Sequence, residues 1–76
     1  MSKKIPALKP SQILKGLVKA GFFIQRQSGS HVRLKHPQKT EALTIARHDR
    51  FEFSHVITQR ILKRADISEE EFLDLL

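Results

Sequence analysis

The fold is decided by residues 22–36, which read FFIQRQSGSHVRLKH. Residues 22–27 open with aromatic and β-branched side chains and continue with polar ones, a pattern that predicts a strand. The pair Ser28-Gly29 predicts a turn, because glycine adopts positive φ without steric cost. A second strand follows over about residues 30–36. The stretch therefore predicts a β-hairpin with the triplet Gly29-Ser30-His31 at its tip.

The side chains of the second predicted strand divide between two faces. Alternation places His31, Arg33 and Lys35 on one face. Val32 and Leu34 fall on the other face, which is the face expected to be buried. The first face carries a titratable imidazole beside two cations, so it suits the binding of a phosphate backbone and chemistry on it.

Both flanks of the hairpin carry the patterns that complete a small domain. Before it, apolar residues at helical spacing follow a proline and end at a glycine, which predicts a helix. After it, a short alternation predicts a third strand, and a second helical stripe follows. The expected elements are a loosely ordered arm over residues 1–9, a helix over about 10–20, a third strand over 41–47, a helix over about 55–65, and a short last helix that begins at a capping box of Ser68 and Glu71.

The predicted order is α-β-β-β-α, with a short helical turn at the C-terminal end. These elements make one α+β domain over residues 1–76, with a three-stranded antiparallel sheet and helices on one face. The other face of the sheet stays open. A chain of 76 residues leaves no room for a second core. The outline is shared with double-stranded RNA-binding domains, although an outline alone decides no function.

Composition and motifs exclude several classes of protein. The chain has no cysteine, so neither disulfides nor thiolate metal sites stabilise it. The basic N-terminal segment is not followed by the apolar run that a signal peptide or a membrane span requires. No phosphate-binding glycine loop, dinucleotide motif or Ser-His-Asp arrangement is present, and the histidines lack zinc-site spacing. We expect a cytoplasmic protein with no membrane association, no metal and no small-molecule cofactor.

Positive charge is concentrated in the first half of the chain. The formal net charge is +6. Residues 1–40 hold nine Lys and Arg residues and no acid, whereas residues 41–76 hold five Lys and Arg residues and eight acids, which gives +9 and −3. Such a block indicates a polyanion as partner, and the alternative is a solvated basic surface. The acidic tail, residues 66–76, is expected to face away from nucleic acid.

The histidine at the hairpin tip is the best candidate for chemistry. RNA is cut without a metal when a base removes the proton of a 2′-hydroxyl, and imidazole is the side chain best suited to this at neutral pH. His31 follows a glycine and a serine, and Ser30 offers a hydroxyl and a backbone N–H to a phosphate oxygen. Arg33 and Lys35 supply charge to the phosphoryl oxygens. The alternative is an exposed histidine without a task.

The other three histidines are weaker candidates. His36 falls on the opposite strand face and is expected to cap the strand end. His48 reaches the open face if the third strand stays regular, which makes it a second candidate as general acid, or as a phosphate contact with Arg47 and Arg50. The alternative for His48 is an ordinary loop residue. His55 begins a helix and is assigned no chemistry.

Two aromatic residues lie near His48 in the sequence. Phe51 and Phe53 are candidates for stacking on a nucleic-acid base. The alternative, which we favour, is that both rings pack against the helices.

Several motifs together resemble a known family. The chain contains LVKAGF at 17–22, Arg26, GSH at 29–31, TIARH at 44–48 and ILKRADISEEEF at 61–72. This combination resembles the HicA toxin family of bacterial type II toxin–antitoxin systems, over about residues 10–76. Each piece alone is a weak signal, and the spacing of all of them is fairly specific.

The resemblance implies a function, a partner and a catalytic residue. Members of the family are small mRNA interferases with a fold like the double-stranded RNA-binding domain, and a HicB antitoxin neutralises them. The family's catalytic histidine, in the Gly-Ser-His motif, corresponds to His31. The family usually has proline two residues before the second histidine, whereas this chain has Ala46 before His48. Alanine restores a backbone N–H there, so the exit from the third strand is expected to differ.

Three interpretations follow from these residues. The leading one is a ribonuclease toxin that binds messenger RNA and a HicB-type antitoxin. The second is a non-catalytic RNA-binding module, and the third is an interaction protein whose basic surface binds an acidic protein. In the leading interpretation the catalytic residues are His31 and, as a weaker candidate, His48, and the RNA-binding residues are Gly29, Ser30, Arg33, Lys35, Arg26 and Arg47.

Overall fold

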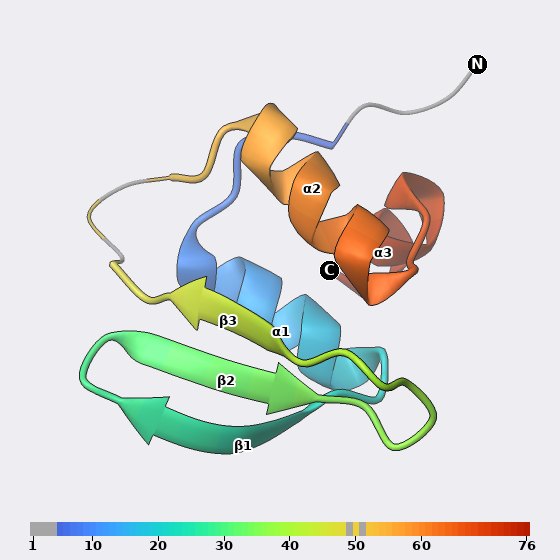
Figure 1. The fold of residues 1–76 in the computed structure, drawn as a ribbon. Coiled ribbons are helices and arrows are strands. Elements are labelled where there is room, and N and C mark those ends of the chain that lie inside the picture. The colour runs from blue at the N-terminus through green and yellow to red at the C-terminus, as the bar shows by residue number, and fades with distance from the viewer. Residues whose placement is uncertain (1–4, 49, 51) are drawn as a thin grey trace.

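Three helices and three strands follow one another in the predicted order (Figure 1). The computed structural model describes residues 5–48, 50 and 52–76. The prediction of an α-β-β-β-α domain with a short last helix is confirmed, while the similarity to double-stranded RNA-binding domains stays a prediction. The elements are α1 (Pro10–Lys19), β1 (Phe23–Ser28), β2 (His31–Lys35), β3 (Leu43–Ala46), α2 (His55–Ala65) and α3 (Glu69–Leu75).

The sheet is antiparallel with the strand order β1-β2-β3, so β2 lies in the centre. The two apolar residues of β2, Val32 and Leu34, are fully buried. Leu43 and Ile45 lie opposite them on β3 and are also buried. The alternation predicted for the second strand is confirmed, and it leaves one face of the sheet covered and the other open.

The helices cover one face of the sheet. Helix α1 contacts β1 and β3, α2 contacts β3, and α3 packs against both other helices. Figure 1 shows α1 against the strands, with α2 and α3 continuing the helical layer past β3. In the described part of the chain, no helix combines the length and apolar character needed to cross a membrane. The helices contribute to the core Ile13, Leu14, Leu17, Leu62, Ala65 and Phe72.

Both C-terminal helices begin at serine caps. The Ser54 side chain accepts a hydrogen bond from the Ile57 N–H at 3.3 Å. The Ser68 side chain accepts one from the Glu71 N–H at 3.1 Å and donates to the Glu71 carboxylate at 3.4 Å. The predicted Ser68 cap is confirmed, while the Glu71 side chain accepts from the Ser68 hydroxyl in place of the backbone N–H that a full capping box uses. Each cap satisfies an N–H that lacks a partner within the helix.

The N-terminal arm is attached to the core. Ile5 and Leu8 are buried. The Leu8 N–H donates to the Phe53 carbonyl at 3.3 Å, and the Phe53 N–H donates to the Leu8 carbonyl at 2.8 Å. The prediction of a loosely ordered arm is therefore wrong for residues 5–9, because two apolar side chains and a β-bridge fix that segment. Residues 1–4 lie outside the described part.

A substitution in α1 tests the packing of α1 on α3. A Cβ atom at Gly16 would lie 2.6 Å from two ring carbons of Phe72, which is fully buried. We expect Gly16→Ala to lower the free energy of unfolding by about 1–3 kcal/mol through overpacking, although alanine alone favours a helix by about 1 kcal/mol. Urea denaturation measures the change.

The control for this experiment is Lys15→Ala, which changes an exposed neighbour on the same helix. Its expected effect is within about 0.5 kcal/mol. The loss caused by Gly16→Ala should shrink in a Phe72→Leu background, since the smaller side chain leaves room. A stabilising Gly16→Ala would contradict the described packing.

Candidate nucleic-acid interface

The hairpin tip is a two-residue turn of Gly29 and Ser30. It lies one residue later than the predicted turn, because Ser28 still pairs with His31 as the last residue of β1. Gly29 has a φ of +57°, a region that side chains with a Cβ rarely adopt. No heavy atom lies within 4 Å of a Cβ placed there. Backbone conformation is therefore what requires glycine at this position, and the space above it is open.

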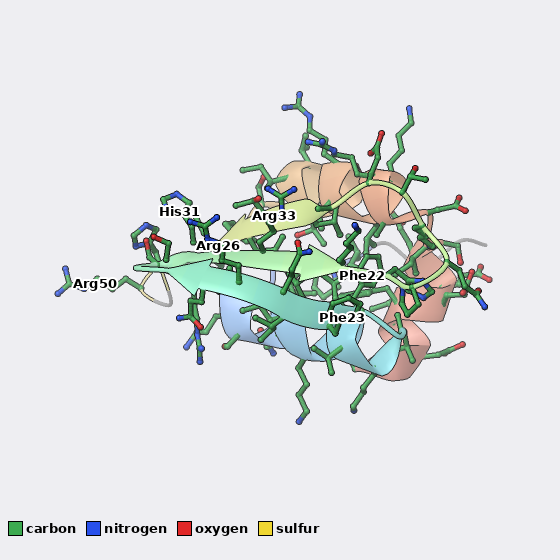
Figure 2. The ribbon with its side chains drawn as sticks, turned by 60° about the horizontal axis from the view of Figure 1, so that its bottom comes forward. Phe22, Phe23, Arg26, His31, Arg33 and Arg50 are labelled. Atoms are coloured by element: carbon green, nitrogen blue, oxygen red, sulfur yellow. The ribbon has the colours of Figure 1, made fainter. Side chains whose placement is uncertain are left out.

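His31 is the first residue of β2 and lies on the open face of the sheet. Its side chain is exposed, and it pairs with Ser28 on β1 and Ala46 on β3. Arg33, two residues on, is exposed on the same face, and Lys35 is half-buried. Figure 2 shows His31 and Arg33 on the side of the strands away from α1. The structure thus brings together the imidazole and the cation that the alternation of β2 predicts.

A β-bulge adds a second arginine to this face. The register of β1 and β2 shifts between Ile24 and Arg26, so Arg26 pairs directly with Arg33. On a regular strand, alternation from Ile24 would place Arg26 on the covered face, whereas the bulge leaves Gln25 outside the pairing and turns Arg26 to the open face. The two guanidinium groups lie beside His31 on strands that contain no acidic residue. Like charges at opposed positions of a sheet repel each other. An anion bound between the two guanidinium groups would relieve this repulsion, so the pair attracts anions.

His48, in the segment that follows β3, contacts the hairpin tip. Its Nε2 atom shares a hydrogen bond of 3.4 Å with the Ser30 hydroxyl. The Arg47 N–H donates to the Ser30 carbonyl at 2.6 Å and keeps the chain after β3 against the turn. His48 therefore lies next to the residue that precedes His31, although β3 ends at Ala46 and the regular strand on which the prediction depended does not extend to His48. Its role stays a prediction.

Arg47 lies elsewhere. It lines an open groove of about 400 Å³ between α1 and β1, together with Lys15 and Lys19. The structure therefore places Arg47 on the other side of the sheet from Arg33 and Lys35, and its role in RNA binding stays a prediction. The physical reason for this placement is alternation: Ala46 pairs with His31 on the open face, so the next residue turns to the covered side.

His36 has a structural position at the far end of the hairpin. Its Nδ1 atom accepts a hydrogen bond from the Gln38 N–H at 3.1 Å. Its ring meets the ring of Phe22 edge-on, with centroids 5.0 Å apart. These contacts fit the predicted capping of the strand end. His55 is exposed at the start of α2.

The aromatic candidates of the loop do not lie on the open face as far as the structure describes them. Phe53 is half-buried and packs against the core. Phe51 lies outside the described residues. Among the described residues, no group of three His, Asp or Glu side chains is placed to hold a metal ion.

Comparison with family models identifies the chain. The model described as the HicA toxin of bacterial toxin–antitoxin systems matches residues 10–67, from α1 to just past α2. The chain belongs to the HicA toxin family. Comparisons with curated proteins and with solved structures gave no significant match. As a member of this family, the protein is the toxin of a toxin–antitoxin system. Toxins of the HicA family pair with an antitoxin.

The opposed arginines yield a stability prediction. We expect Arg26→Gln to raise the free energy of unfolding by about 0.2–1 kcal/mol at low salt, because it removes the repulsion from Arg33. The gain should shrink in high salt, which screens exposed charges. Thermal unfolding at two salt concentrations measures it. Arg60→Gln, on the exposed surface of α2, removes the same net charge; an equal gain there would assign the effect to net charge instead.

Proposed function

We propose that this HicA-family toxin is an mRNA interferase, an endoribonuclease that cleaves messenger RNA in the cytoplasm and so inhibits translation and growth. The observation that carries the proposal is an exposed imidazole, His31, beside the opposed pair Arg26 and Arg33 on the uncovered face of the sheet. The family assignment supports the proposal, because it makes the protein a toxin.

The reaction needs a base and a site that stabilises negative charge. His31 accepts the proton of a ribose 2′-hydroxyl, and the freed oxygen attacks the adjacent phosphorus. The bond from phosphorus to the 5′-oxygen of the next nucleotide breaks, and that oxygen takes up a proton. The products are a 2′,3′-cyclic phosphate and a free 5′-hydroxyl. Arg26 and Arg33 neutralise the charge that builds on the phosphoryl oxygens.

The proton for the leaving oxygen has a candidate donor. His48 shares a hydrogen bond with Ser30 and therefore lies at the same end of the hairpin as His31. In this proposal His48 is the general acid, and Ser30 orients its ring. Lys35, half-buried on the same face further along β2, contacts a neighbouring phosphate. Phosphate contacts carry no sequence information, so this part of the site binds RNA without base preference.

The catalytic role of His31 can be tested directly. We expect His31→Ala to lower the rate of RNA cleavage by about 10²–10⁴-fold, the usual contribution of a positioned base, and to abolish growth arrest. The fold should be unaffected because the side chain is exposed. The measurement is cleavage of total RNA by purified protein in the presence of a chelator, with analysis of the product ends.

The matched control is His55→Ala, which removes an exposed histidine at the start of α2. It should cleave RNA at the parental rate. Undiminished cleavage or toxicity in His31→Ala would defeat the assignment. RNA that is bound and shifted but left intact by the parent protein would favour the alternative, a non-catalytic RNA-binding module.

A HicB-type antitoxin is the proposed protein partner. We expect it to bury His31 and to place acidic residues opposite Arg33 and Lys35, since complementary charge steers such complexes. Histidine modification by diethyl pyrocarbonate, followed by mass spectrometry, measures the accessibility of each ring. In the complex His31 should lose reactivity while His55 keeps it. Equal reactivity of His31 with and without antitoxin would contradict direct occlusion.

A further inference from the structure

An exposed aromatic ring lies on the same face as the candidate active site. Phe23 pairs with Lys35, and paired residues of antiparallel strands point to the same side of the sheet. Phe23 is 45% exposed, whereas Phe22, which points the other way, is buried in the core. The ring of Phe23 therefore lies on the open face with His31 and Arg33. Figure 2 shows Phe23 and His31 at opposite ends of the sheet.

Three residue pairs follow one another along this face. Phe23 and Lys35 form the first pair, the two opposed arginines the second, and His31 with Ser28 the third. The first and third are separated by four residues of β2, or about 13 Å. At the rise of about 3.4 Å per nucleotide of a stacked strand, this length holds about four nucleotides, and fewer where the bases are splayed apart. One RNA strand can therefore contact all three pairs.

We propose that Phe23 is a stacking platform for an unpaired base, which makes single-stranded RNA the ligand of this face. The proposal rests on the proposed function, because it takes RNA as the substrate at His31. A flat aromatic ring recognises the face of a base, and in a duplex those faces are hidden within the stack. Arg26 and Arg33 hold the phosphate backbone between the stacked base and the bond that is cut.

The position of Phe23, more than its exposure, points to this role. A single exposed apolar side chain is ordinary on a protein surface. Ile24, its neighbour, is 51% exposed but lines the groove beside α1 on the covered side of the sheet. The two residues thus present apolar side chains of similar exposure to opposite faces. Ile24 therefore provides a matched control for an effect that belongs to the open face.

The first experiment measures RNA binding in a His31→Ala background, so that the ligand stays intact. Phe23→Leu keeps an apolar side chain but removes the ring, and Phe23→Tyr keeps the ring. We expect Phe23→Leu to weaken the binding of a short fluorescein-labelled single-stranded RNA about 5- to 150-fold, the usual loss for a base–aromatic stack. Phe23→Tyr and Ile24→Ala should bind as the parent does.

Two results of this experiment would overturn the proposal. One is parental RNA affinity in Phe23→Leu with a fold unchanged by circular dichroism. The other is an equal loss in Ile24→Ala, which would show that the effect does not belong to the open face. A Phe23→Leu variant that keeps its RNA affinity but no longer binds the antitoxin would assign the ring to the protein partner and would also overturn it.

The second experiment locates the stacked base with active protein. The substrate is a DNA strand with a single ribonucleotide, which fixes the bond that is cut, and abasic sites are placed one at a time on either side of it. In the active parent protein, which keeps His31, we expect one abasic position within about four nucleotides of that bond to lower kcat/KM. The same abasic site should have little further effect in Phe23→Leu.

The two experiments separate this proposal from the proposed function. Suppose that the parent protein cleaves RNA and that every abasic site lowers kcat/KM by the same factor in Phe23→Leu as in the parent. The stacking proposal then fails and the ribonuclease stands. If the parent cleaves no RNA but Phe23→Leu still loses single-stranded RNA affinity, the ribonuclease fails and the stacking platform stands as part of an RNA-binding surface.

Discussion

The alternation of side chains along β2 is the constraint on which both the core and the candidate site depend. Val32 and Leu34 are fully buried and hold the central strand against the helices. The same register places His31 and Arg33 on the opposite face. The positions of these two residues therefore cannot change without a change in the packing of Val32 and Leu34. A slip of one residue would expose the core and bury the imidazole together. Stability of the small domain and geometry of the site are therefore maintained by the same pairing.

The bulge in β1 resolves a conflict that regular pairing would leave. Ile24 lies on the covered side, where it lines the groove beside α1, and Arg26 lies on the open side next to Arg33. Residues two positions apart point to the same face of a regular strand, so a bulge that leaves Gln25 outside the pairing is needed to turn Arg26 to the open face. An edge strand can accommodate such an irregularity because its outer side has no neighbour to lose. The arginine pair is thus a consequence of where β1 lies in the sheet.

Features set by neighbours in the sequence were predictable, and those set by distant pairing were not. The alternation of β2 and the cap at Ser68 depend on residues a few positions apart, and both predictions are confirmed. The N-terminal arm was mispredicted because Leu8 is fixed by a bridge to Phe53, far along the chain. The bulge at Gln25 depends on how β1 aligns with β2, which alternation within β1 alone does not reveal.

The placement of charge explains how so small a domain tolerates a cluster of cations. Arg26 and Arg33 lie on the open face of strands whose other face is packed. Their guanidinium groups are exposed, so water and salt screen the repulsion between them. An anion that binds there relieves the repulsion without any rearrangement of the sheet, because the guanidinium groups are already in place. Under the proposed function, RNA and an acidic antitoxin both gain this same relief. Since one pair of cations cannot be neutralised by two partners at once, binding of one weakens binding of the other even where their remaining contacts do not overlap.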